Sequence, residues 1–201
     1  MKTVKRIACS FMALALVVGL TACSAKPFDH QTMVDYAEEE DLYELDEPED
    51  FMVEYGELLG GSGGDGVYIS CDGKDAQYIY DKDINRMGDF PDYDVDEATT
   101  MFFASKNGYG LFFVITFEET KDAEKFYKKY TDAFASDSEE GKSKGITYSL
   151  EHGGGTKSKE SYFGAYLNGN TVLVVRAMVE ETDYVDGICK AYGVKSPTKV
   201  K

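Results

Sequence analysis

Hydrophobic residues recur along this chain with two different spacings. Short runs rich in aromatic and β-branched residues are typical of strands. Longer stretches repeat their apolar positions every three or four residues, which is typical of amphipathic helices. The runs that predict strands are 67–71, 76–81, 100–105, 110–117, 145–150, 161–167 and 171–178.

Three dipeptides between these runs predict tight turns. Asp72-Gly73 separates the first two runs, although with a slightly longer loop, and Asn107-Gly108 and Asn168-Gly169 separate two later pairs. Asn-Gly and Asp-Gly suit the positive φ angles of primed hairpin turns. We therefore expect three hairpins, followed in two cases by a helix.

Helical spacing occurs in three places. We expect helices at 28–42, at about 121–135 with Thr120 as the N-cap, and from about 183 to Tyr192, where Gly193 ends the helix and Pro197 prevents its resumption. The last two helices each follow a hairpin and an "EET" tripeptide, at an offset of 62 residues that aligns Phe126 with Ile188. This pattern predicts two hairpin–helix units, by duplication or by convergence.

Short strands, tight turns and helices after pairs of strands predict an α+β fold, a largely antiparallel sheet with helices on one face. The two hairpin–helix units follow the N-terminal helix. We expect a signal peptide at 1–22, an acidic helix and glycine-rich linker at 23–65, one domain at 66–196 and a tail at 197–201. The glycine-rich run "HGGGTKSKE" (152–160) is expected to be a mobile loop.

The N-terminus has the composition of an export signal. Lys2, Lys5 and Arg6 precede an apolar segment of about 13 residues, which is too short for a permanent transmembrane helix. Leu20-Thr21-Ala22-Cys23 follows and resembles the lipobox of bacterial lipoproteins. The resemblance covers only the first 23 residues and implies cleavage before Cys23, which becomes lipidated. It places the protein at the cell membrane, anchored on the extracytoplasmic side. The rest of the chain is similar only in layout to small bacterial lipoproteins.

Charge is distributed unevenly. Residues 23–97 contain 23 acidic and 4 basic side chains, whereas 98–201 contain 14 of each. Nucleic acid is therefore not an expected partner, because phosphate binding depends on Lys and Arg. The acidic run 38–50 is either an extended spacer that holds the domain off the bilayer or a solvated helix end and loop.

Two cysteines remain after Cys23. Cys71 is expected on the inward face of its strand and Cys189 on the apolar side of the last helix. Export permits a disulfide between them, and two buried free thiols are the alternative. A catalytic pair of Cys71 with His152 is a further, weaker hypothesis.

One acidic stretch resembles the calcium loop of EF-hand-like sites. In "DKDINRMGDFPD" (81–92), oxygen-bearing side chains occupy loop positions 1, 3, 5, 9 and 12. The candidate ligands are Asp81, Asp83, Asn85, Asp89 and Asp92. The stretch departs from the pattern because Arg86 replaces the turn glycine and Asp92 replaces the bidentate glutamate. An unliganded acidic loop is the alternative to a calcium site.

Catalytic signatures are sparse in the sequence. There are 2 histidines and no tryptophan, and we find no nucleophile motif and no phosphate-binding glycine loop. We therefore expect a non-catalytic, lipid-anchored binding or accessory protein with no cofactor, whose partner is an envelope protein, a peptide or a small ligand. The alternatives are a lipid-anchored hydrolase that uses acidic residues and a calcium-dependent structural module of the envelope.

Overall fold

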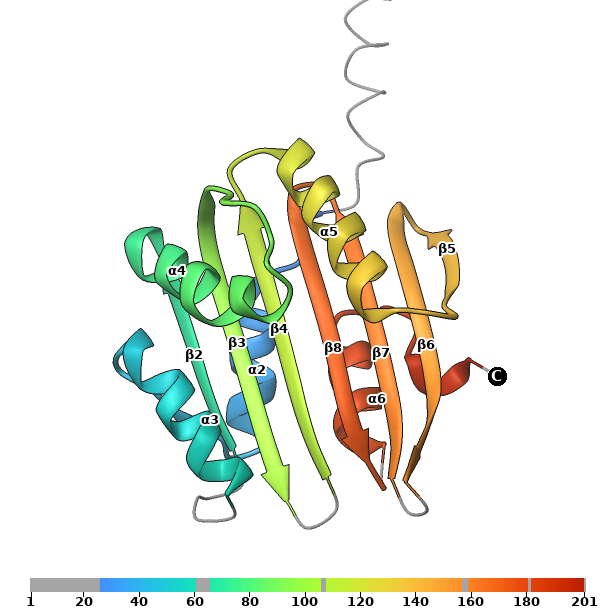
Figure 1. Ribbon diagram of the computed structural model, residues 1–201, viewed down its shortest axis with the longest axis horizontal. Coiled ribbons are helices and arrows are strands. Elements are labelled where there is room, and N and C mark those ends of the chain that lie inside the picture. Colours follow the sequence, from blue (N-terminus) through green and yellow to red (C-terminus); the bar gives the residue numbers. More distant parts are fainter. Residues whose placement is uncertain (1–25, 61–65, 106–107, 157–158, 181, 201) are drawn as a thin grey trace, which may run out of the picture.

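The computed structural model describes residues 26–60, 66–105, 108–156, 159–180 and 182–200. Eight strands form one sheet in the order β1-β2-β3-β4-β8-β7-β6-β5 (Figure 1). Only β1 and β2 pair in parallel, and all other neighbours are antiparallel. The strands are β1 (Tyr43–Glu44), β2 (Gly66–Asp72), β3 (Val95–Ser105), β4 (Gly108–Phe117), β5 (Glu139–Ser143), β6 (Ile146–Thr156), β7 (Lys159–Asn168) and β8 (Thr171–Val179).

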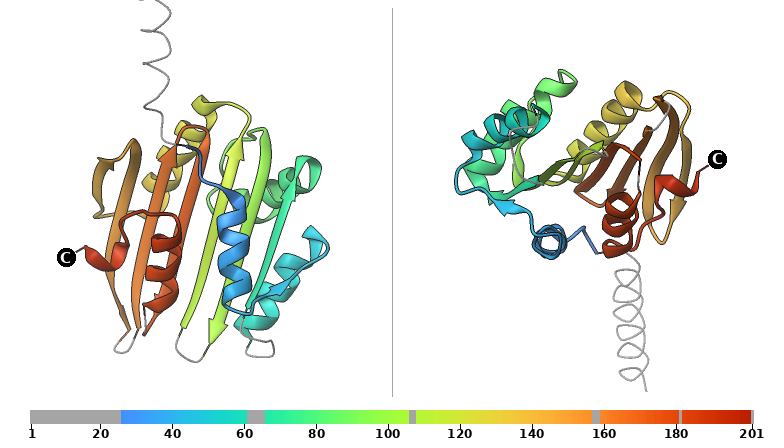
Figure 2. Two further views of the ribbon diagram at one scale, coloured as in Figure 1. Left: turned by 180° about the vertical axis from the view of Figure 1, so that it is seen from behind. Right: turned by 90° about the horizontal axis from the view of Figure 1, so that it is seen from below.

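Helices cover both faces of this sheet. We call the face under α3, α4 and α5 the front face and the face under α2 and α6 the back face, as Figures 1 and 2 show. The longer helices are α2 (His30–Glu39), α3 (Phe51–Leu59), α4 (Gly73–Ile79), α5 (Thr120–Phe134) and α6 (Asp183–Ala191). Short helical turns are η1 (Pro48–Asp50), η2 (Tyr80–Ile84), η3 (Asn85–Met87) and η4 (Pro197–Lys199). The α+β class and the largely antiparallel sheet are confirmed. The expectation that the helices lie on one face only was wrong.

The central strands explain why both faces are covered. Along β4, Phe113 and Ile115 enter the core of the front face while Phe112 and Val114 enter that of the back face. Successive side chains of a strand point to opposite faces, so a strand that is apolar at every position needs a layer on each side. β4 and β8 pair with each other at the centre of the sheet.

The two hairpin–helix units are present, but their helices lie on opposite faces. Phe126 and Tyr130 of α5 are in the front core, whereas Ile188 and the partly buried Tyr192 belong to the back core. The 62-residue offset therefore relates two segments with the same order of strands and helix, but the helices pack on opposite faces of the sheet. The back helices pack closely, because a Cβ added at Gly187 would lie 2.5 Å from the Tyr36 hydroxyl.

The hairpin expected around Asp72-Gly73 was wrong. Gly73 does adopt a positive φ of 53°, but residues 73–87 form α4, η2 and η3 instead of a strand. Ala76, Ile79 and Tyr80 are buried at helical spacing on the front face. The apolar residues of this short run fit both the two-residue spacing of a strand and the three-to-four-residue spacing of a helix. Packing against the sheet favours the helix.

The glycine-rich run 152–160 was also assigned wrongly. β6 continues to Thr156 and pairs with β7, with an irregularity in the register between Gly153 and Thr156. Within the described residues, this run extends the sheet instead of forming a mobile loop. Glycine in a strand often accompanies such irregularities.

The domain begins before residue 66, the boundary expected from the sequence. α2 packs on β2 and β3, and β1 extends the sheet beside β2. The acidic run 38–50 is therefore a helix end, a short strand and a 3-10 turn instead of an extended spacer. Of the glycine-rich linker at 56–66, residues 56–59 lie in α3 and residues 61–65 lie outside the described residues.

The first described residues are fixed against the sheet. The Asn168 side chain donates a hydrogen bond to the carbonyl oxygen of Lys26. Phe28 is buried, and its ring packs edge-on against Tyr192 with the centroids 5.6 Å apart. Residue 26 therefore lies beside the turn that joins β7 and β8.

Candidate functional site

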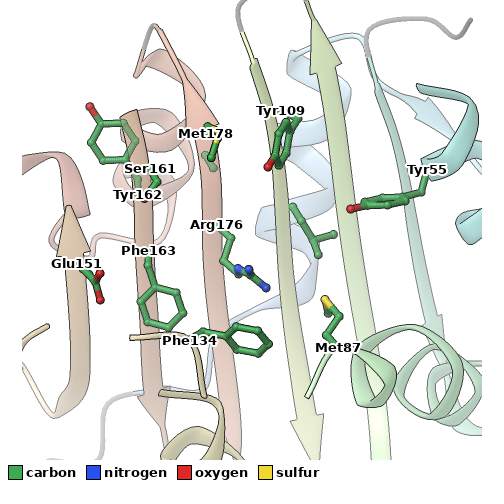
Figure 3. A pocket seen from close by; sticks show the side chains of 12 residues that line it. Tyr55, Met87, Tyr109, Phe134, Glu151, Ser161, Tyr162, Phe163, Arg176 and Met178 are labelled. Carbon is green, nitrogen blue, oxygen red and sulfur yellow. The ribbon is translucent and has the colours of Figure 1, made fainter. Parts of the chain in front are cut away.

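Part of the front face is not covered by helices. α5 covers the strand segments near the β7–β8 turn, and α3 covers β2 and β3. Between them the sheet is open over β4, β8 and β7, and the opening is a concave groove of about 350 Å³ (Figure 3). We call it the front groove. Its lining includes Tyr55, Met87, Tyr109, Leu111, Phe134, Glu151, Ser161, Phe163, Arg176 and Met178.

The strand period brings these side chains to one surface. Tyr109 and Leu111 alternate along β4, and Arg176 and Met178 alternate along β8. Leu111 lies opposite Arg176 in the register of the two strands. The walls come from Tyr55 on α3, Met87 at the end of η3 and Phe134 at the end of α5, as Figure 3 shows.

Arg176 provides the positive charge of the front groove. Its side chain is half-buried, and the guanidinium carbon lies 4.3 Å from the centroid of the Phe134 ring. Such a cation–π contact positions the guanidinium without neutralising it. In the described parts of the chain, no carboxylate lies within ion-pair distance of Arg176.

One polar neighbour of Arg176, Tyr130, is itself deeply buried. The Tyr130 hydroxyl has no hydrogen-bond partner, and burial raises the pKa of Tyr130 to about 12 while the guanidinium acts in the opposite direction. At neutral pH Tyr130 is therefore uncharged and cannot act as a counterion. The guanidinium retains donors for an anion that enters the groove.

A smaller cavity opens from the front groove beneath α3. This side pocket has a volume of about 90 Å³ and shares Tyr55, Met87 and Leu111 with the groove. The rest of its lining is Phe51, Met52, Asp83, Ile84 and Thr100. The two cavities adjoin each other, with Arg176 in the groove and the Asp83 carboxyl group in the side pocket.

Asp83 is the unusual residue of the side pocket. It is 7% exposed, and its Oδ2 atom has no hydrogen-bond partner among the described residues. Burial raises the pKa of Asp83 to about 7, against the opposing effect of the Arg86 charge. The carboxyl group therefore changes its charge near neutral pH.

The calcium candidates are not arranged as a loop around an ion. Asp81, Asp83 and Asn85 lie on the helical turns η2 and η3, and Asp81 accepts a hydrogen bond of 2.9 Å from Gln77. Asp83 is buried while Asp89 and Asp92 are exposed. Within the described ranges there is no group of three or more His, Cys, Asp or Glu residues that could hold a metal ion.

The structure separates the other predicted pairs. Cys71 packs against the front core and Cys189 lies in the back core, so both are free thiols and the alternative with a disulfide between them does not occur. Burial raises the pKa of Cys71 to about 12 and that of Cys189 to about 11. His152 lies on β6, with four strands between it and β2, so the pair of Cys71 with His152 does not form. Cys23 lies outside the described residues.

Sequence reasoning missed the front groove and Arg176. A signal was available, because Arg176 interrupts the otherwise apolar segment "VLVVRAM" at the centre of the sheet. A charged residue in a strand that is covered on both faces needs a reason. The reason became visible only when the end of α5 and the position of α3 showed where the front face stays open.

Comparisons with known proteins add little to this description. No family model matches the chain, and no curated protein matches it. Among solved structures, the extracellular domain of PknH from Mycobacterium tuberculosis is similar over 72% of this chain and 93% of that domain, with 12% identity and a TM-score of 0.37. This likeness is too low to carry an argument about fold or function. No described helix is both long enough and apolar enough to cross a bilayer.

Proposed function

We propose that this protein is a lipid-anchored, extracytoplasmic binding protein of the bacterial envelope, and that its front groove takes a small molecule or peptide with an anionic group on an apolar body. The observation that carries the proposal is Arg176, a half-buried cation without an ion-pair partner among the described residues, in a groove whose other lining is aromatic and aliphatic apart from Glu151 and Ser161. A mostly apolar pocket with a few oriented polar groups is the usual form of a ligand site.

The contacts indicate how such a ligand is held. The Phe134 ring fixes one face of the guanidinium, so the planar group presents its edge to an anion. Leu111 and Met87 offer apolar surface beside it, and the Tyr109 ring stands at the rim, 39% exposed. A carboxylate suits this geometry because it accepts two parallel hydrogen bonds from a guanidinium.

Binding to this groove is tested with a chain that begins at residue 24, which contains every described residue and lacks only the anchor. Alkyl and aromatic carboxylates are titrated by calorimetry, with the corresponding primary amides as uncharged controls. We expect carboxylates to bind at least about tenfold more tightly than their amides, because charge-assisted hydrogen bonds contribute about 1.5–3 kcal/mol. Arg176→Gln removes this preference, while the exposed Lys128→Gln retains it. Equal binding of acids and amides would contradict the proposal.

The lipid anchor determines how the groove faces the membrane. Cys23 precedes Lys26 by three residues, which span at most about 11 Å. Lys26 is fixed at the β7–β8 turn, and that turn contacts the end of β4, just before α5, through hydrogen bonds between Asn170 and Phe117. Tyr109 lies at the other end of β4, about 27 Å from Phe117 for eight residues of strand. The groove therefore opens at the end of the sheet that faces away from the bilayer.

The anchoring part has its own experiment. The chain contains no tryptophan, so single tryptophans report one position each. In the lipidated protein on vesicles, Glu119→Trp at the start of α5 is expected to be quenched by brominated lipids and Tyr109→Trp is not. A Cys23→Ser variant that stays on the vesicles, or equal quenching at both positions, would contradict the anchor or this orientation.

A further inference from the structure

The side pocket beneath α3 holds a carboxyl group that the fold does not use. Asp83 is 7% exposed, its Oδ2 lacks a partner, and it makes no ion pair within the described part of the chain. Most of the pocket lining is apolar, and although Tyr55 and Thr100 also line it, neither of their hydroxyl groups hydrogen-bonds to the Asp83 Oδ2 atom. Buried polar groups are nearly always paired in native proteins, so an unpaired one needs an explanation.

The shape of the pocket limits what can reach this carboxyl group. A volume of about 90 Å³ has room for the equivalent of roughly three waters at about 30 Å³ each. The pocket opens into the front groove, where Tyr55, Met87 and Leu111 line both cavities. A group that reaches Asp83 therefore enters on a narrow apolar stem from the groove.

The register of the sheet sets the spacing between the side pocket, at Thr100, and Arg176 in the front groove. Phe102, Leu111 and Arg176 lie opposite one another on β3, β4 and β8, and Thr100 of the side pocket is two residues along β3 from Phe102. Two strand spacings and two residues of strand place the Cα atoms of Thr100 and Arg176 about 12 Å apart. A ligand that reaches both Arg176 and the side pocket of Asp83 must therefore be elongated and cross Leu111.

We propose that the side pocket binds a primary ammonium group on an aliphatic stem, so that the groove and the pocket together select ligands whose carboxylate contacts Arg176 and whose ammonium group contacts Asp83. The class includes ω-amino carboxylates and short peptides with a lysine side chain. The proposal rests on the proposed function of the front groove and adds the chemistry of the second end. An ammonium group supplies the donors that the Asp83 carboxyl group lacks.

The test uses a series of ω-amino carboxylates from aminobutanoate to aminodecanoate, each compared with the ω-hydroxy and methyl-terminated acid of equal length. Affinity for the chain from residue 24 is measured by calorimetry. We expect the amino compounds to bind at least about tenfold more tightly than both analogues at one preferred length. Asp83→Asn abolishes this preference for the amino compounds. Asp81→Asn, on the same turn, retains it.

The outcomes separate the two proposals. If acids bind through Arg176 but the terminal amine adds nothing, or if Asp83→Asn keeps the preference, the assignment of the side pocket is overturned and the groove stands. Equal affinity of the ω-hydroxy acids would make the pocket a site for a neutral donor and overturn it too. If no acid binds, both proposals fail. Thermal unfolding of Asp83→Asn checks that the variant is folded.

Discussion

The two faces of the sheet differ in how they hold their buried ionisable side chains. On the back face, both ring nitrogens of His30 are hydrogen-bonded, to the hydroxyl oxygens of Thr99 and Thr116, each at 2.9 Å. On the front face, Asp83 has an unpartnered carboxyl oxygen and Arg176 has no carboxylate beside it. The back face pairs its buried histidine within the fold, whereas the front face leaves two ionisable groups of opposite charge without an ion-pair partner among the described residues.

The difference follows from where the helices end. α2 and α6 lie side by side along the back face, and the back core includes Tyr36, Ile188 and Val175 (Figure 2). On the front face, α5 ends at Phe134 and α3 lies over the edge strands, so the middle of the sheet remains open (Figure 1). A closed face stabilises the fold, and an open one provides a binding surface. Substitutions that affect the two faces unequally test this comparison.

The largest expected difference is in packing. Ile188→Ala on α6 removes a side chain with 0% exposure and lowers the free energy of unfolding by about 2–5 kcal/mol. Met87→Ala removes a half-buried side chain at the groove wall and lowers it by less than about 1 kcal/mol. Urea unfolding followed by circular dichroism measures both. A similar loss from the two variants would mean that the groove wall is part of the stabilising core.

The second difference is in acid stability, and it concerns His30. Burial lowers the pKa of His30 to about 4, so between pH 6.5 and pH 4 the unfolded chain binds a proton that the folded chain does not. The wild type is therefore expected to lose up to about 3 kcal/mol of stability over that interval as the pH falls. His30→Gln keeps hydrogen-bonding groups without titrating and loses less. Parallel stability curves for the two proteins would show that His30 does not control this interval.

Asp83 is expected to act in the opposite direction. Its raised pKa means that the folded chain holds a proton between about pH 4 and pH 7 that the unfolded chain releases. Wild-type stability therefore falls as the pH rises through this interval. Asp83→Asn is expected to be more stable than the wild type by about 1–3 kcal/mol at pH 8 and about equally stable at pH 4.

Nearby groups do not reverse the sign of that prediction. The Arg86 charge favours ionisation of Asp83 but is outweighed by burial, and the Cys71 thiol, which Asp83 also affects, stays protonated because its pKa is about 12. Chemical unfolding at the two pH values measures the difference. An Asp83→Asn variant that is less stable at pH 8 would show that the carboxylate has a stabilising partner.

The sequence predicted the fold best where a pattern had one interpretation. The hairpins around Asn107-Gly108 and Asn168-Gly169 and the helix at Thr120–Phe134 occur as expected, because hydrophobic period and turn chemistry agree there. "AQYIYD" failed because its apolar residues fit both a strand and a helix, and contact with the sheet decides between them. Local pattern also could not show that α6 crosses to the face opposite α5.

The candidate site was less accessible from sequence than the fold. The spacing of the acidic residues in 81–92 predicted a calcium loop. The structure instead makes Asp83 a single buried carboxylate on a helical turn. Arg176 is 93 residues away in sequence and lies on β8, whereas Asp83 lies on the helical turn η2. Their relation depends on strand order and on the end of α5, which are tertiary features that no local spacing encodes.

The smallest expected effect concerns the two thiols, one near each face. Cys71 packs beside the front core and Cys189 is 1% exposed in the back core, with the sheet between them. A reducing agent is therefore expected to shift the melting temperature by less than about 1 °C, whereas loss of a disulfide that contributes about 2–4 kcal/mol would lower it by several degrees. Both thiols should also react slowly with iodoacetamide in the folded protein, because burial holds their pKa values at about 12 and about 11. Rapid alkylation of Cys71 alone would place its thiol outside the front core. The front face would then be accessible at a second position besides the groove, which would weaken the comparison between the two faces.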